Sequence, residues 1–247
     1  MWLVLCSSSD NSGLWVYQGL RQLGVGPIEL VLSESLASGS RWEHRLDGSA
    51  TQLRVTLPDG RTLCSSRIRG AINRVVAPAP GIDRQAAISD REYAQAELHA
   101  FYLSWLYGLS GIVINRSGPV GLCGPWYHIS EWVSRACRAG LKAPVYRQSA
   151  HDAAACGYVS LAPEGATTIK LIAFRGEVYG GRVDEPVARA CARLAQEAKT
   201  ELLGIELYAS QNREWMFASA TPYPSLLAGG MPLLRSLADA LTQGATS

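Results

Sequence analysis

The sequence predicts an α/β protein in which an N-terminal parallel α/β domain is followed by a C-terminal α+β domain with an antiparallel sheet. Three observations support this fold class. The N-terminus alternates an apolar run, an amphipathic helix and a second apolar run, which is the pattern of a parallel strand–helix–strand unit. Helical patterns with clear start and stop signals fill the middle of the chain. The last third contains apolar strands joined by short turns, which is typical of an antiparallel sheet.

The first half of the chain contains the expected parallel unit. Residues 2–7 and 28–33 are short apolar runs that predict buried strands. Between them, Ser12 is a candidate helix cap and Gly24 a helix stop. Further strands are expected at 41–46, 51–57 and 68–75, with a Pro-Asp-Gly turn after the second of them.

The middle of the chain predicts two helices and one strand. A capping-box pattern at 89–92 opens a helix that runs to about residue 107. Residues 111–116 form a strand that ends in polar residues, and 126–139 form a helix that Gly140 ends. The intervening stretch, 117–125, is rich in Gly and Pro. We therefore expect one domain over 1–120 and a second over 121–247.

The C-terminal part predicts strands and two further helices. Turns are expected at 163–165 and 175–177, and Pro186 marks the first turn of a helix that runs to about residue 201. Residues 204–209 and 214–220 form a hairpin. A last helix is expected over 231–241.

Composition excludes several classes of protein. The chain has 247 residues, of which 47% are hydrophobic and 18% charged, as in packed soluble proteins. A net charge of +2 gives no case for nucleic acid. No apolar run is long enough to cross a bilayer, and the N-terminus has no basic leader. Six cysteines without metal-like spacing favour a reducing, cytoplasmic location.

The order of these pieces resembles the ATP-grasp superfamily, and most closely its RimK-like branch, which includes microviridin-type peptide ligases. Four segments carry the resemblance. They are GAINRVV, REYAQAELHAFYLSWLYGLSGIVINRSGPV, ISEWVSRACRAGLKAPV, and TIKLIAFRGEVYGGRVD with LGIELYASQNREWMFASATPYP. The resemblance implies a pre-ATP-grasp domain, an ATP-grasp core, and an ATP-dependent carboxylate–amine ligase that uses magnesium.

The departures from the family pattern concern the parts that bind nucleotide and metal. The family's Glu-x-Asn metal ligands fall on Ser219 and Thr221, and its upstream Asp falls on Glu206. Residues 151–168 stand where the family has a lid domain. Magnesium needs several hard oxygen donors, so one carboxylate does not organise a nucleotide. The resemblance therefore implies a degenerate fold in which Glu206 is a vestigial metal ligand.

Five residues are candidates for binding an anion or substrate. Lys170 and Arg182 fall on the two basic positions of the family's C-terminal strands, where they could flank one carboxylate or phosphate. The alternative is a structural ion pair between Glu206 and Arg182. The others end strands of the N-terminal domain, where side chains either face the ligand crevice or are ordinary surface groups. These three are Arg74, Asn115 and Arg116.

We expect the chain to be a non-catalytic binding or scaffold subunit in a peptide- or amide-forming biosynthetic pathway, without a cofactor. It would bind a peptide or carboxylate, or a partner enzyme, with aromatic residues of the cleft as anchors. Trp126, Trp132 and Trp215 are expected in the core or in the cleft wall. The alternative is an ATP-dependent carboxylate–amine ligase of minimal form that uses ATP and Mg. A structural role in a homodimer is the third hypothesis.

Overall fold

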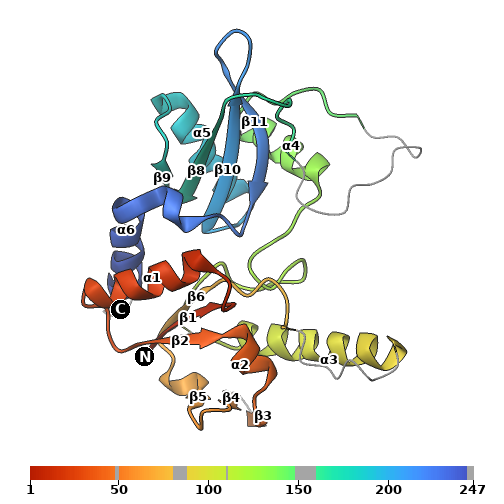
Figure 1. Ribbon diagram of the computed structural model, residues 1–247, viewed down its shortest axis with the longest axis vertical. Coiled ribbons are helices and arrows are strands. Elements are labelled where there is room, and N and C mark those ends of the chain that lie inside the picture. The colour runs from red at the N-terminus through yellow and green to blue at the C-terminus, as the bar shows by residue number, and fades with distance from the viewer. Residues whose placement is uncertain (48–49, 80–87, 110, 148–159, 244–247) are drawn as a thin grey trace. The chain divides into compact units, whose positions relative to one another are not determined.

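The computed structural model describes residues 1–47, 50–79, 88–109, 111–147 and 160–243. The chain forms two compact units (Figure 1). The first contains residues 1–124 and 234–247, and the second contains residues 125–233. The expected domain ranges, 1–120 and 121–247, stay a prediction.

The first unit is built on a parallel sheet with the strand order β2-β1-β6-β7. Its strands are β1 (Trp2–Cys6), β2 (Ile28–Leu32), β6 (Gly70–Asn73) and β7 (Ile112–Ile114). Every pairing in it is parallel, which confirms the fold class predicted for the N-terminus. The burial of all five residues of β1 explains its continuous apolar sequence, because a central parallel strand is covered on both faces.

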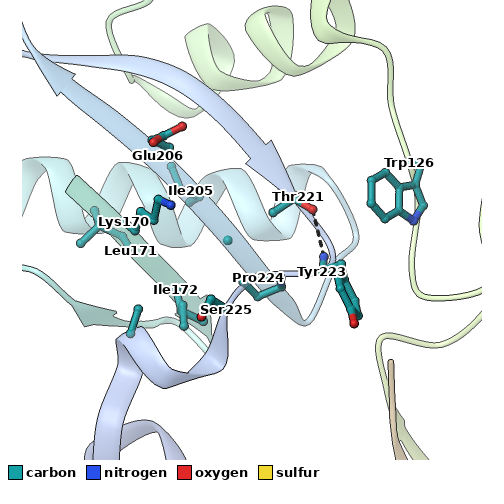
Figure 2. Close-up of a pocket in the computed structure, with 12 residues that line it drawn as sticks. Trp126, Lys170, Leu171, Ile172, Ile205, Glu206, Thr221, Tyr223, Pro224 and Ser225 are labelled. Carbon is teal, nitrogen blue, oxygen red and sulfur yellow. Dashed lines mark hydrogen bonds between the residues drawn. The ribbon is translucent and has the colours of Figure 1, made fainter. Parts of the chain in front are cut away.

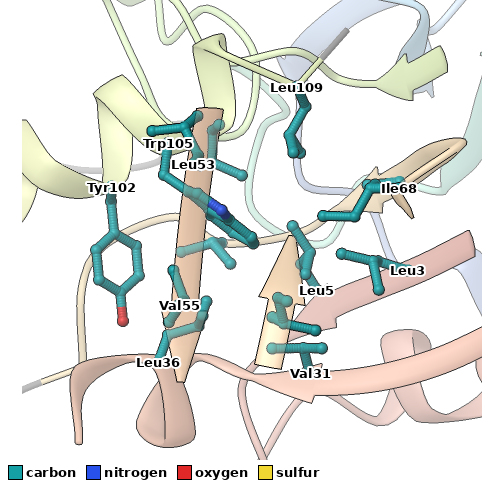
Figure 3. Packing of buried hydrophobic residues seen from close by; sticks show 14 of the residues in the cluster. Leu3, Leu5, Val31, Leu36, Leu53, Val55, Ile68, Tyr102, Trp105 and Leu109 are labelled. Carbon is teal, nitrogen blue, oxygen red and sulfur yellow. The ribbon is translucent and has the colours of Figure 1, made fainter. Parts of the chain in front are cut away.

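Helices and a second sheet cover this parallel sheet. The helices are α1 (Asn11–Gln22), α2 (Ser33–Ala37) and α3 (Ile88–Tyr107), with a 3-10 turn, η1 (Ser65–Arg67). The second sheet is antiparallel and contains β3 (Arg41–Asp47), β4 (Ala50–Thr56) and β5 (Thr62–Cys64). Figure 3 shows the core that they enclose. Leu3 and Leu5 of β1 lie there with Leu53 and Val55 of β4 and with Trp105 of α3.

The last helix, α6 (Gly230–Gln243), returns to the first unit from residue 234 onward. Its Leu234 packs on α1 at Gly19. A Cβ atom on Gly19 would lie 2.3 Å from Cδ2 of Leu234, so only glycine allows this approach. The side chains of Leu234 and Leu237 are both buried.

The second unit is an antiparallel sheet with helices on one face (Figure 1). The strand order is β11-β10-β8-β9, and helices α4 and α5 share its core. The elements are α4 (Ile129–Ala139), β8 (Thr168–Phe174), β9 (Glu177–Gly180), α5 (Glu185–Glu197), β10 (Leu202–Ala209), β11 (Trp215–Thr221) and the 3-10 turn η2 (Leu226–Gly229). These pairings confirm the antiparallel C-terminal sheet.

Alternate residues of the strands divide this sheet into two faces. Leu171, Leu203, Ile205 and Phe217 pack against α4 and α5. The residues between them point to the opposite face, which we call the open face. It carries two rows across the strands. One row is Lys170–Glu206–Ser219, and the other is Ile172–Gly204–Thr221.

Some sequence-based details were wrong or remain outside the described residues. The cap of α1 is Asp10 and not Ser12, because the Asp10 carboxylate accepts hydrogen bonds from the backbone N–H groups of Ser12 and Gly13. The helix expected from residue 126 begins at Ile129. Residues 160–167 form no strand, and residues 148–159 lie outside the described part of the chain.

Candidate functional site

The carboxyl ends of β1 and β6 meet in a buried ion pair. Arg74 Nε lies 2.6 Å from Asp10 Oδ2, and Arg74 Nη2 lies 3.1 Å from Asp10 Oδ1. Only 2% of the Arg74 side chain and 4% of the Asp10 side chain are exposed. Asp10 also caps α1, so this pair fixes the start of the helix. Arg74 is therefore a buried structural group and not the surface group of the alternative, and a role for it in ligand binding stays a prediction.

Asn115 and Arg116 stabilise the loops after the strands. The carbonyl oxygen of buried Asn115 accepts a hydrogen bond from Asn73 Nδ2 at 3.0 Å. Asn115 has φ +56°, a left-handed conformation that asparagine tolerates better than most residues. Arg116 donates to the carbonyl oxygens of Leu109 and Gly111, both at 2.7 Å. The contacts of both residues are those of loop structure, and a role in substrate binding stays a prediction.

The open face of the second unit carries the remaining predicted site residues. Glu206 and Lys170 are cross-strand partners, with Ser219 on the other side of Glu206. Glu206 Oε2 accepts hydrogen bonds from Ser219 Oγ at 3.1 Å and from Ser160 Oγ at 3.2 Å. Lys170 is exposed and makes no ion pair within the part of the chain that the structure describes.

A pocket of about 330 Å³ begins at Lys170 and Glu206 and follows the open face (Figure 2). Its floor is the row Ile172–Gly204–Thr221. A Cβ atom on Gly204 would lie 2.6 Å from Cβ of Pro224, so the missing side chain allows the segment after β11 to close over the strand. The other lining residues are Trp126, Leu171, Ile205, Tyr223, Pro224, Ser225 and Ala228. The pocket is therefore mainly apolar and has one lysine and one carboxylate at one end.

The described residues of this pocket do not fit a magnesium–nucleotide complex. Glu206 is the one carboxylate among them, and two serine hydroxyls already bind one of its oxygens. The Thr221 hydroxyl accepts a hydrogen bond from the backbone N–H of Tyr223 at 3.1 Å. In the described part of the chain, no group of three His, Cys, Asp or Glu side chains could hold a metal ion. Magnesium in a phosphoryl-transfer site needs more oxygen donors than this.

The structure separates Arg182 from Lys170. The β8–β9 ladder ends at the pair Leu171–Gly180, so Arg182 lies beyond the ladder. Arg182 lines a different cavity, with Asp184 and Trp215. Lys170 and Arg182 thus line different cavities, and the expectation that they flank one anion stays a prediction. The described residues contain no ion pair between Arg182 and Glu206.

The three tryptophans expected in the core or in the cleft wall have different environments. Trp126 lines the open-face pocket and is 38% exposed. Trp132 lies in the core of the second unit, with 4% of its surface exposed. Trp215 lines the cavity of Arg182. The sequence analysis did not identify Tyr223 or Ser160 as site residues. A signal for Tyr223 was available, because the segment TPYP is a Pro-rich turn and such turns can fold back over the preceding strand.

The buried cysteines are not nucleophiles. Burial raises the pKa of Cys6, Cys123 and Cys191 to about 12 in each case. The thiolate is the reactive form, so these thiols stay protonated and inert at neutral pH. Cys123 donates a hydrogen bond to the backbone carbonyl of Asn73 at 3.0 Å, so its thiol has a structural role next to Arg74 in the chain.

Solved structures share this architecture over almost the whole chain. Macrocyclase MdnC of Microcystis aeruginosa, solved with its precursor peptide MdnA, has a TM-score of 0.77 at 12% identity, covering 98% of this chain and 100% of that one. This decides the fold. The chain has the fold of the ATP-grasp ligases. The predicted fold class and the predicted likeness to microviridin-type peptide ligases are thereby confirmed.

Two further structures bear on ligands. A RiPP-associated ATP-grasp ligase of Chryseobacterium gregarium, solved with ADP and a leader and core peptide, has a TM-score of 0.75 at 10% identity, covering 98% of this chain and 96% of that one. The ATP-grasp ligase PsnB, solved with a minimal precursor, Mg and ADP, has a TM-score of 0.67 at 13% identity, with coverages of 100% and 98%. No family model and no curated protein matches the sequence.

The comparisons favour the alternative function over the expected one. Two of the similar proteins are named as ligases and are solved with ADP, so the expectation of no cofactor is not supported by the likeness. All three are solved with a precursor or with a leader and core peptide, which agrees with the expectation of a peptide ligand. At such low identity the likeness establishes the fold alone. Within the described residues, no helix is long and apolar enough to cross a membrane.

Proposed function

We propose that this protein binds a peptide in a peptide- or amide-forming biosynthetic pathway, using the open-face pocket of its ATP-grasp fold. The proposal that the ligand is a peptide is supported by the fold, which this chain shares with proteins solved with bound peptides. The lining of the pocket supports a particular kind of peptide. Its apolar floor beside the exposed Lys170 suits a peptide in which an apolar side chain lies next to a carboxylate.

We further propose that the protein performs this role without ATP-dependent ligation. The single observation that carries this step is the environment of Glu206. Its Oε2 is bound by Ser160 and Ser219, and the pocket offers no second carboxylate among the described residues. Without metal ions to neutralise the phosphates, the fold loses most of what catalyses phosphoryl transfer.

The second candidate function is an ATP-dependent carboxylate–amine ligase of minimal form. The observation that favours it is the fold, which is shared with ligases solved with ADP. In that case Glu206 would be the magnesium ligand and Lys170 would contact phosphate, with ATP supplying the activation of the carboxylate.

Calorimetric titration with Mg·ATP and with Mg·AMPPNP separates the two candidates. We expect no heat at millimolar nucleotide and no magnesium-dependent ATP hydrolysis. Binding tighter than about 100 μM, which is roughly −5.5 kcal/mol, would establish the ligase candidate instead. In that case Glu206→Gln should abolish nucleotide binding.

A second titration tests the peptide site itself. The probes are acetyl-Ala-Ala-Phe with a free carboxylate and the same tripeptide as its amide. We expect the acid to bind at least about tenfold more tightly, because the charge-assisted contact with Lys170 is lost in the amide. Lys170→Met should remove that preference. Lys199→Met removes the same charge from an exposed position outside the pocket and should leave it intact. Equal binding of acid and amide would refute a carboxylate site at Lys170.

A further inference from the structure

A second cavity, of about 630 Å³, lies on the helical side of the C-terminal sheet. We call it the basic groove. It is formed by the end of α4, the segment after β9, the start of α5 and the β10–β11 hairpin. Leu141, Val183, Val187 and Trp215 line it and also pack on the core shared with α4 and α5. The groove and the open-face pocket therefore lie on opposite faces of one sheet.

Charged side chains surround this groove unequally. Lys142 Nζ is paired with Glu214 Oε1 at 2.6 Å. Arg182 and Arg213 are exposed, and neither makes an ion pair with any residue that the structure describes. Asp184 is the other carboxylate of the lining; it stands at the cap position of α5 and makes no capping hydrogen bond. Outside the Lys142–Glu214 pair, the lining thus contains two arginines and one carboxylate.

The backbone that carries Arg213 is held in place. Arg213 has φ +60°, a left-handed conformation that is uncommon for arginine. Its backbone N–H donates to the Ser210 carbonyl at 2.9 Å. The Glu214 N–H donates to Ser210 Oγ at 3.2 Å, and the Ser210 N–H donates to the Glu214 carbonyl at 2.9 Å. A guanidinium on a fixed turn loses less conformational entropy when it binds a carboxylate.

The basic groove has an apolar floor and a rim that carries Arg182 and Arg213. Leu141 is 5% exposed, and Val183, Val187 and Trp215 are half-buried. Such a floor accepts an aliphatic or aromatic side chain, and rim arginines accept carboxylates in a two-pronged geometry. Both features together match a peptide in which acidic residues flank an apolar one.

We infer that the basic groove is a docking site for an acidic peptide segment with a central apolar side chain, contacted by Arg182 and Arg213. The inference stands independently of the proposed function, because the groove shares no lining residue with the open-face pocket. The observation that carries it is charge complementarity over an apolar floor. It also gives Arg182 a role on a face of the sheet where the sequence did not place it.

Calorimetry of the full chain with a defined probe tests the inference. The probe is acetyl-Glu-Glu-Phe-Leu-Glu-Glu-amide at about 50 mM salt, where charge contacts are weakly screened. Its neutral counterpart has Gln in place of Glu. We expect the acidic probe to bind and the neutral probe to bind at least tenfold more weakly. The double variant Arg182→Gln/Arg213→Gln should weaken the acidic probe at least tenfold.

A matched control removes the same charge elsewhere. Arg138 and Arg189 are exposed arginines of α4 and α5 that are paired with Glu197 and Glu185 and do not line the groove. Arg138→Gln/Arg189→Gln should change the affinity less than twofold. The inference is overturned if the acidic probe gives no heat, if both probes bind equally, or if the control variant loses as much as the test variant.

Lys170→Met distinguishes the two sites. It should leave the affinity for the acidic probe unchanged while removing the carboxylate preference of the open-face pocket. If it abolishes acidic-probe binding, the probe occupies the open-face pocket and the inference about the groove fails. Competition by millimolar inorganic phosphate would identify a phosphate site and would equally overturn a peptide site. Because Arg182 and Arg213 are exposed, unchanged thermal unfolding is expected for their variant.

Discussion

The parallel sheet of the first unit and the antiparallel sheet of the second unit use basic residues in opposite ways. In the first unit, Arg74 follows a parallel strand, is buried and is bound by Asp10. In the second unit, Lys170 lies on an antiparallel strand beside Glu206 but is exposed and forms no ion pair within the described residues. Arg74 is therefore a structural group, whereas Lys170 is a candidate ligand contact. Burial and the presence of a partner make the difference, and residue type does not.

Removal of Arg74 should have the largest effect. Arg74→Ala leaves the Asp10 carboxylate buried without its partner, so we expect a loss of about 3–5 kcal/mol in unfolding free energy. Urea denaturation measures it. Arg182→Ala, which removes an exposed guanidinium, is the comparison. Equal stability of Arg74→Ala and the wild type would show that the buried pair does not hold the first unit together.

Gly204→Ala should have an intermediate effect on the second unit. The added Cβ would lie 2.6 Å from Cβ of Pro224, and overpacking of this kind costs about 1–3 kcal/mol. The same change narrows the open-face pocket, so binding of acetyl-Ala-Ala-Phe should weaken as well. Gly118→Ala is a suitable control, because a Cβ atom at this position would have no neighbouring atom within 4 Å and the residue belongs to the other unit.

Thiol reactivity should follow burial in both units. At pH 8 a pKa of about 12 leaves about one thiolate in ten thousand, so Cys6, Cys123 and Cys191 should resist iodoacetamide in the folded protein. Cys137 is exposed and should react before these three buried thiols. Raising the pH toward 12 raises the thiolate fraction of the buried groups. Peptide mass mapping of the alkylated protein measures the order in which the cysteines react. Early labelling of Cys6 would contradict its burial in the folded protein.

The smallest effect is expected for the open-face lysine. Lys170→Met should change the unfolding free energy by no more than about 0.5 kcal/mol, because exposed positions without partners contribute little. Thermal unfolding of Lys170→Met checks the expected stability, and peptide titration checks the expected loss of the carboxylate preference. A stability loss near that of Arg74→Ala would mean that Lys170 is a structural residue after all.

The sequence was sufficient for most of the elements and for the type of the first unit's parallel sheet and the second unit's antiparallel sheet, but helix α2 was not expected. Continuous apolar runs identified β1 and β2, and the segment LGIELYASQNREWMFASA identified the β10–β11 hairpin, because local patterns reflect burial on two faces or on one. The likeness of these segments to ATP-grasp proteins supplied the architecture that periodicity alone does not give.

The sequence was insufficient wherever partners are far apart in the chain. Asp10 and Arg74 are 64 positions apart, and nothing local shows that the carboxylate is a helix cap rather than a loop acid. The position of Arg182 depended on where the β8–β9 ladder ends, and strand ends are the least certain part of a sequence-based prediction. A shift of one residue at such an end moves a side chain to the opposite face of the sheet.

The return of α6 to the first unit has a consequence for the timing of synthesis. Residues from 234 onward leave the ribosome long after α1, yet Leu234 packs on Gly19 of that helix. A nascent chain that has completed the parallel sheet must therefore keep that part of α1 uncovered until α6 has emerged. During this interval the surface of α1 at Gly19 stays uncovered, and the second unit, contiguous over residues 125–233, is complete before the first.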